Sequence, residues 1–208
     1  MAVTWPFALA WSTVGLLAGL VLAPSTACWL NRTNRERSHA DLIAAVLTGA
    51  MFALIAARFS AMLELLALSV FVAIGVQLAV IDTHTHRLPR TLIWPTWTIV
   101  TCLYTAETVI DVEKIANLAR AIAGSAILVG FYVMIAIASR GGIGAGDVRM
   151  AALVGCVLGW HSWPAVISGT FLAFATAGTI TVVFKHVKMS VIPFGPAMLL
   201  GAITALLL

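Results

Sequence analysis

Two aspartates in an otherwise apolar chain are the residues whose surroundings suggest chemistry. Asp147 ends the stretch "GAGD", and Asp82 opens the stretch "DTHTHRLPR". An ionisable side chain within apolar sequence is a functional candidate by default. Two carboxylates held close together cannot both ionise at low cost, so they share a proton, and one can act as base while the other acts as acid. Such a pair can activate water for attack on a peptide carbonyl.

The residues around the two aspartates predict irregular backbone beside each one. Gly144 and Gly146 permit backbone conformations that other residues resist, and they allow a second backbone to approach closely. Leu88 and Pro89 force an extended or turned chain before the next helix. A phosphate-binding loop is disfavoured, because no strand precedes the glycines and no Gly-Lys-Ser/Thr follows them. A plain turn with a solvated Asp147 is the alternative.

The histidines and cysteines of the chain are possible metal ligands. His84 and His86 form a His-x-His pair near Asp82, but the sequence offers no obvious further ligand for a zinc site. The alternative is a pair of imidazoles near lipid head groups that tune the site. The cysteines lie in separate segments without a Cys-x-x-Cys pair. We therefore expect neither a metal nor another cofactor.

The composition indicates a membrane protein. The chain has 208 residues, of which 62% are hydrophobic and 10% charged, whereas about a quarter of residues are charged in soluble domains. Its apolar runs repeatedly reach about 20 residues, the length needed to cross a bilayer as a helix. We predict one membrane-embedded domain over residues 1–208, an all-α polytopic bundle. About eight transmembrane helices are expected, at residues 5–29, 41–57, 61–81, 91–107, 115–138, 147–162, 164–184 and 190–208. Gly155 and Gly159 have the spacing of close helix packing.

The basic residues predict the orientation. Of the 12 Lys and Arg residues, nine fall in or beside the connections on one side of the eight spans, and Arg58, Lys114 and Arg120 fall on the other. The positive-inside rule then places the first side in the cytosol and both termini outside. Asp82 and Asp147 would lie at cytosolic helix ends. Acids at the outer ends, including Glu64 and Glu107, are expected in water. We interpret the net charge of +4 as an orientation signal, so no nucleic-acid partner is expected.

Several motifs together resemble the type IV prepilin peptidases, which belong to the GxGD class of intramembrane aspartyl proteases. Residues 144–147 are similar to the family's Gly-x-Gly-Asp motif, and a basic residue, Arg149, follows two positions later. Asp82 stands six residues before Leu88 and seven before Pro89, as in the family's first motif. This resemblance implies that Asp82 and Asp147 are catalytic, and that Leu88 and Pro89 shape the site.

A third motif extends the resemblance to the C-terminal end. The segment "VIPFGPAMLLGA" is similar to the family's Pro-Phe-Gly-Pro segment. The resemblance implies that Pro193, Gly195 and Pro196 also shape the active site. The first connection is only about ten residues long and lacks the two Cys-x-x-Cys pairs of many family members, which are linked to N-methylation. We therefore expect no methyltransferase activity.

The resemblance implies an aspartic endopeptidase of the cytoplasmic (inner) membrane. Its partners would be the lipid bilayer and the helix of a prepilin or pseudopilin, whose leader it removes at the cytosolic face. A GxGD protease with other membrane substrates is the nearest alternative. A small ion- or proton-coupled transporter would also place acids in the membrane, although the sequence shows no inverted repeat.

Overall fold

The structure is a computed structural model that describes residues 5–27, 34–139, 143–183 and 193–208. The side chains of residues 25–27, 34–38 and 40 are not described. Several basic residues behind the predicted orientation are therefore not described: Arg32, Arg140, Lys185 and Lys188 lie outside the described residues, and only the backbone of Arg35 and Arg37 is described.

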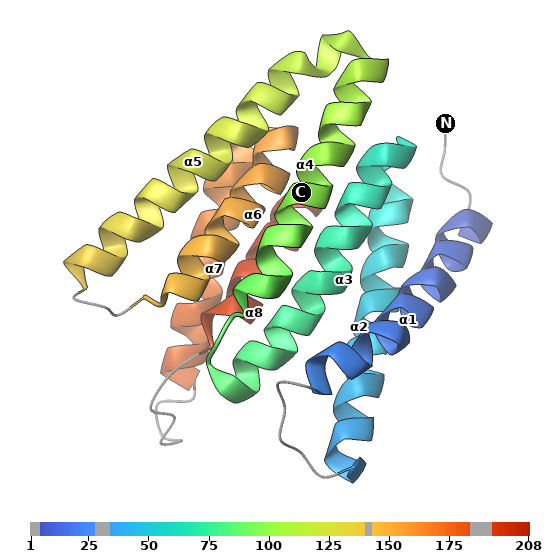
Figure 1. The fold of residues 1–208 in the computed structure, drawn as a ribbon, viewed down its shortest axis with the longest axis vertical. Coiled ribbons are helices and arrows are strands. Elements are labelled where there is room, and N and C mark those ends of the chain that lie inside the picture. Colours follow the sequence, from blue (N-terminus) through green and yellow to red (C-terminus); the bar gives the residue numbers. More distant parts are fainter. Residues whose placement is uncertain (1–4, 28–33, 140–142, 184–192) are drawn as a thin grey trace.

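The all-α prediction is confirmed for the described residues, which form eight α-helices and a short 3-10 helix without a strand (Figure 1). Each predicted span overlaps one α-helix. The elements are α1 (Trp5–Ala27), α2 (Asn34–Arg58), α3 (Met62–Thr85), α4 (Arg90–Ile110), η1 (Val112–Lys114), α5 (Ile115–Ala138), α6 (Ala145–His161), α7 (Trp163–Val183) and α8 (Phe194–Leu207).

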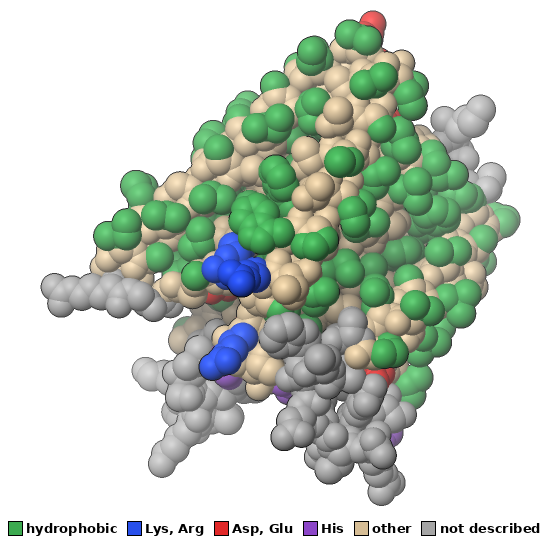
Figure 2. Space-filling view, viewed as in Figure 1, with side chains coloured by type: hydrophobic (Ala, Val, Ile, Leu, Met, Phe, Trp, Pro, Cys, Tyr) green, Lys and Arg blue, Asp and Glu red, His purple; other side chains and the backbone are tan. Residues whose placement is uncertain are grey.

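Five of the described helices, α1, α2, α3, α5 and α7, are long and apolar enough to cross a membrane. Hydrophobic side chains cover most of the face seen in Figure 2, as a lipid-facing surface requires. The remaining α-helices are shorter or more polar: α6 has 17 residues, α8 has 14, and α4 carries several threonines. A transmembrane helical protein is therefore confirmed, while eight spans and the positions of the termini stay predictions.

The threonines of α4 are compatible with membrane depth because their hydroxyls bond within the helix. The Thr96, Thr101 and Thr108 hydroxyls donate to carbonyls one turn earlier, at 2.7 to 2.8 Å. A hydroxyl satisfied in this way exposes little unpaired polarity to lipid. The lower hydropathy of α4 does not prevent it from lying among apolar helices.

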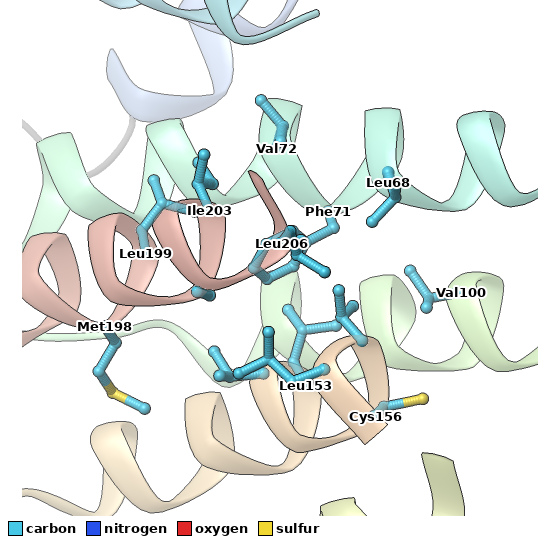
Figure 3. Close-up of a cluster of buried hydrophobic side chains, with 14 of the residues drawn as sticks. Leu68, Phe71, Val72, Val100, Leu153, Cys156, Met198, Leu199, Ile203 and Leu206 are labelled. Carbon is cyan, nitrogen blue, oxygen red and sulfur yellow. The ribbon is translucent and has the colours of Figure 1, made fainter. Parts of the chain in front are cut away.

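Helices α3, α4, α6 and α8 surround a cluster of buried apolar side chains (Figure 3). Around these four, α1 packs on α2, α5 packs on α6, and α7 packs on α8. The cluster places the C-terminal end of α3 and the N-terminal ends of α6 and α8 at the same end of the bundle. Its labelled members include Leu68, Phe71, Val72, Val100, Leu153, Leu199, Ile203 and Leu206.

Glycines set the closest helix contact, between α5 and α6. A Cβ atom added to Gly124 would lie 2.5 Å from the Gly155 carbonyl oxygen, and one added to Gly159 would lie 2.6 Å from the Arg120 carbonyl oxygen. No larger residue fits at these points without moving the helices apart. The close-packing role predicted for Gly155 and Gly159 is confirmed.

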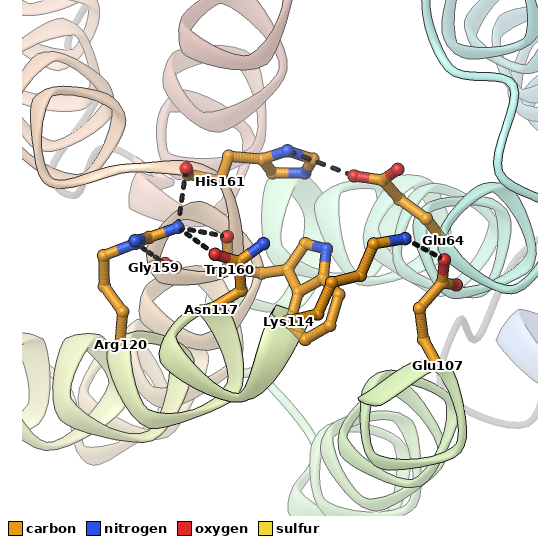
Figure 4. Close-up of polar contacts among 8 residues, drawn as sticks. All are labelled: Glu64, Glu107, Lys114, Asn117, Arg120, Gly159, Trp160 and His161. Carbon is orange, nitrogen blue, oxygen red and sulfur yellow. Dashed lines mark hydrogen bonds and ion pairs between the residues drawn. The ribbon is translucent and has the colours of Figure 1, made fainter. Parts of the chain in front are cut away.

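The expectation that water solvates Glu64 and Glu107 was wrong. Their side chains are only 18% and 9% exposed. The Lys114 ammonium donates to the Glu107 carboxylate at 2.6 Å, and the His161 imidazole contacts the Glu64 carboxylate at 3.3 Å (Figure 4). These partners, on η1 and α6, pair with one oxygen of each acid within the protein. We call this end of the bundle, opposite Asp82 and Asp147, the distal end.

Candidate active site

Asp82 lies in the last turn of α3 and is 5% exposed. The helix ends at His86, whose φ of 50° is left-handed and whose backbone N–H donates to the Asp82 carbonyl at 2.9 Å. Leu88 and Pro89 continue as an extended segment, and Pro89 is the N-cap of α4. The predicted turned chain before the fourth helix is therefore present, and it holds Asp82 at the end of the bundle.

The Asp82 carboxylate is held by the start of α8. The Gly195 backbone N–H donates to Asp82 Oδ2 at 2.8 Å. N–H groups in the first helical turn lack intrahelical partners, and the helix dipole favours negative charge there. A Cβ atom on Gly195 would lie 3.0 Å from Asp82 Oδ2, so glycine allows this approach. Pro193 is the N-cap of α8, and Pro196 follows Gly195 in the first turn.

Asp147 is held locally, by its own turn. It is the third residue of α6, and its Oδ2 accepts the Gly144 backbone N–H at 3.1 Å. The Gly144 carbonyl in turn accepts the Asp147 N–H at 3.1 Å. This reciprocal arrangement resembles the second half of a capping box. It fixes the carboxylate at the N-terminal end of α6.

The glycines beside Asp147 contribute through their missing side chain rather than through unusual backbone angles. Gly144 is extended, with φ −73°, and neither it nor Gly146 has a left-handed φ. The expected glycine-only conformation was therefore wrong at both positions. Close approach is the correct part of the expectation: a Cβ atom on Gly146 would lie 2.8 Å from Leu88 Cβ. Gly146 thus brings the start of α6 against the Leu88–Pro89 segment.

Asp82 and Asp147 line the same open pocket, which has a volume of about 380 Å³. Leu88, Pro89, Gly144 and Gly146 line it as well, so the pocket gathers residues from two distant sequence motifs. Pro193 and Pro196 do not line it. The other lining residues are His86, Arg87, Ala145 and Arg149.

An apolar groove of about 230 Å³ lies beside Asp82, between α2, α3 and α8. Thr83 and Pro196 line it, and these residues directly follow Asp82 and Gly195 in the chain. Leu47 and Leu199 contribute apolar walls. A hydrophobic segment in this groove would therefore end next to the pocket.

An aromatic cluster behind the pocket was not predicted from the sequence. Tyr132 of α5, Phe174 of α7 and Phe194 of α8 lie with ring centroids 5.2 to 5.9 Å apart. Phe194 directly precedes Gly195, so the cluster fixes the N–H group that Asp82 accepts. These rings come from three separate helices, and no spacing in the sequence links them.

The described residues contain no group of three or more His, Cys, Asp and Glu side chains that could hold a metal ion. His86 lines the pocket with Asp82. Cys102 and Cys156 are free thiols on different helices. The acidic side chains that line the described pocket are those of Asp82 and Asp147.

Comparison with known proteins agrees with the motifs. Residues 66–206 match the model of the type IV leader peptidase family. The prepilin leader peptidase/N-methyltransferase of Bacillus subtilis (strain 168) is 32% identical over 167 residues, which cover 79% of this chain and 64% of that relative. The chain thus spans less than two thirds of the length of this curated relative. No solved structure matches. The family match covers more than half of the chain, which therefore belongs to the type IV leader peptidase family.

Proposed function

We propose that the chain is an aspartic endopeptidase that removes the leader peptide from type IV prepilins or prepilin-like proteins. The observation that carries the proposal is that Asp82 and Asp147, from motifs 65 positions apart in the sequence, line one open pocket. Membership of the leader peptidase family supports the same reaction.

In the proposed mechanism the carboxylate pair holds one proton. The ionised carboxylate removes a proton from water, and the resulting hydroxide attacks the peptide carbonyl carbon. The protonated carboxyl group donates its proton to the carbonyl oxygen. The tetrahedral gem-diol then collapses: the C–N bond breaks and the leaving nitrogen takes the proton that came from water. One hydroxyl of the intermediate returns its proton to the ionised carboxylate as the carbonyl re-forms, which restores the single proton of the pair. The Gly195 and Gly144 N–H groups hold the two carboxylates in place during these steps.

The proposed substrate has a polar leader followed by an apolar helix. The groove along α3 and α8 is lined mainly by apolar side chains and ends beside Asp82. An apolar helix in this groove would present the bond before it to the pocket, which is open to water. Glycine at the cut would loosen the helix there, because it is a poor helix former.

We also propose that the pocket faces the cytosol and that the protein lies in the cytoplasmic membrane with both termini outside. Arg87 and Arg149 line the pocket, which agrees with a cytosolic end by the positive-inside rule. Reporter fusions at Arg87 should be cytosolic and fusions at Lys114 external. The reverse result would contradict the orientation.

The central test is co-expression with a tagged type IV prepilin, scored by leader removal and by the mass of the mature N-terminus. Asp82→Asn and Asp147→Asn should each lower the cleavage rate on the order of 10²- to 10⁴-fold, because each removes one partner in proton transfer. Asp111→Asn is the matched control, since Asp111 is 44% exposed at the distal end. Substantial cleavage by either pocket variant at normal protein levels would exclude that residue from the mechanism.

The same experiment addresses the alternatives. A GxGD protease with other substrates would leave the prepilin intact, and a transporter would lose ion flux in the Asp147→Asn variant. We further propose that the cleaved product keeps an unmodified amine, because the connection between α1 and α2 contains no Cys-x-x-Cys pair. An increment of roughly 14 Da, one added methylene, that depends on this protein would contradict that proposal.

A further inference from the structure

The helices that carry the two aspartates are joined at their distal ends. Glu64 lies in the first turn of α3, and His161 is the last residue of α6. Glu64 Oε1 lies 3.3 Å from His161 Nδ1, and the two side chains are 18% and 17% exposed (Figure 4). At 1.5 Å per helical residue, this contact lies about 27 Å from Asp82 along α3 and about 21 Å from Asp147 along α6.

Neighbouring residues fix the His161 side of this contact. The Arg120 guanidinium of α5 donates to the Gly159, Trp160 and His161 carbonyls at 2.7 to 2.8 Å, which ties down the end of α6. The Phe59 ring lies 5.0 Å from the His161 ring. The His161 imidazole is therefore held in front of Glu64 by contacts on several sides.

The contact resists separation of the two helices. A largely buried carboxylate or imidazole that loses its polar partner is unfavourable, because burial limits the water that can replace the contact. Along most of their length α3 and α6 pack on α4 and α8 rather than on each other. At the other end, the start of α6 meets the segment after α3 where Gly146 approaches Leu88. The relative tilt of α3 and α6 is thus constrained at both ends.

We propose that the Glu64–His161 contact positions the active site: it fixes the tilt of α3 against α6 and thereby the separation of Asp82 and Asp147. The inference rests on the proposed peptidase function. Helices behave as nearly rigid rods over this length, so a displacement at the distal ends is transmitted to the aspartates. A misplacement of about 1 Å can cost roughly a hundredfold in rate. Glu64 and His161 are positioning residues, since they lie far from the pocket.

The first measurement does not depend on cleavage. Spin labels are placed at Thr83 on α3 and Ala145 on α6, in a variant whose three cysteines are replaced, reconstituted in nanodiscs. We expect His161→Leu to shift or broaden the label–label distance distribution measured by electron paramagnetic resonance. Trp97→Phe is the matched control, because it removes a 3.2 Å hydrogen bond to Ser125 between α4 and α5, neither of which carries an aspartate. It should leave the distribution unchanged.

The second measurement is prepilin cleavage by the unlabelled protein, normalised to folded protein. His161→Leu should lower kcat about tenfold and leave KM within about twofold, because the distal contact does not touch substrate. The reversed pair, Glu64→His with His161→Glu, rebuilds the contact and should recover most of the lost rate. A purely structural contact would lower the amount of folded protein without this recovery. Trp97→Phe should cleave like the wild type.

The outcomes are separable. An unchanged distance distribution in His161→Leu, or an equal change in Trp97→Phe, would overturn the inference. If His161→Leu does not accumulate, Glu64→Gln and the reversed pair take its place, and equal kcat in Glu64→Gln and the wild type would overturn it. If the wild type cleaves no prepilin, the proposed function fails, while the distance measurement still decides whether this contact sets the tilt.

Discussion

Asp82 and Asp147 occupy one pocket but are supported in opposite ways. The backbone N–H that Asp82 accepts comes from Gly195, 113 positions away in the sequence, whereas Asp147 accepts the N–H of Gly144, three positions away. Asp82 is buried, and Asp147 is partly exposed. One half of the site is therefore built by tertiary packing and the other by a single helix start.

This difference predicts that substitutions far from the pocket disturb Asp82 more than Asp147. The support of Asp147 forms wherever α6 begins with its glycines, because all the atoms belong to one turn. The support of Asp82 requires α8 to pack against α3 and α7, and requires the rings of Tyr132, Phe174 and Phe194 to hold the start of α8. Substitutions on the Asp82 side should therefore cost more activity than equivalent ones on the Asp147 side.

Among substitutions of the residues that support the two aspartates, the largest effect is expected for Gly195→Ala. The new methyl group would lie 3.0 Å from Asp82 Oδ2 and push the carboxylate or α8 aside. We expect prepilin cleavage to fall roughly a hundredfold at normal protein levels. Gly178→Ala is the control, because no atom lies within 4 Å of a Cβ atom at that position. Similar cleavage by both variants would contradict the tight support of Asp82.

Gly146→Ala should have the next largest effect, about tenfold. Its methyl group would lie 2.8 Å from Leu88 Cβ and separate the two motifs that meet in the pocket. The double variant Gly146→Ala with Leu88→Gly removes the Leu88 Cβ atom and should cleave faster than Gly146→Ala alone in the same assay. Additive losses would show that the contact is not the cause.

Phe194→Leu should lower cleavage several-fold. It removes ring contacts with Tyr132 and Phe174, worth about 0.5–1.5 kcal/mol for each aromatic pair, and loosens the residue before Gly195. Phe131→Leu tests the same chemistry at a ring that contacts Tyr132 and Phe174 but is 38% exposed. Equal losses in the two variants would remove the special role of Phe194 in supporting Asp82.

The smallest effect is expected for Gly144→Ala, about threefold or less. Its methyl group would lie 3.2 Å from Asp147 Oδ2, the end of a side chain that can rotate, and the Gly144 N–H would remain. Cleavage kinetics of Gly144→Ala and Gly195→Ala, measured in the same assay, compare the two supports directly. If the two variants lost the same activity, the distinction between local and distant support would fail.

The sequence predicts the features that depend on local contacts and misses those that depend on distant ones. Apolar runs located the helices, because lipid and a buried core impose the same demand on long segments. The motifs around Asp82 and Asp147 predicted turned chain, because Leu88–Pro89 acts over a few residues. The bond from Gly195 to Asp82 was not predictable, since no local pattern says which helix start meets which carboxylate.

Two expectations from the sequence were wrong for physical reasons. Glu64 and Glu107 were expected in water because a carboxylate at a helix end usually reaches it, but His161 and Lys114 pair with them inside the protein. Glycines near Asp147 were expected to adopt rare backbone angles, and the structure uses their missing side chain instead. A sequence shows that glycine is present but not which of its two properties is used.

The shortness of α6 has a consequence for the surrounding lipid. With 17 residues this helix measures about 26 Å, less than the hydrocarbon core of about 30 Å. In the proposed topology α6 begins at the pocket, and residues 145–149 at its start are not fully buried. Head groups and water would therefore reach inward at this end of the bundle. The protein would thus form a local dip in the membrane, and the scissile bond could meet water without leaving the lipid phase entirely.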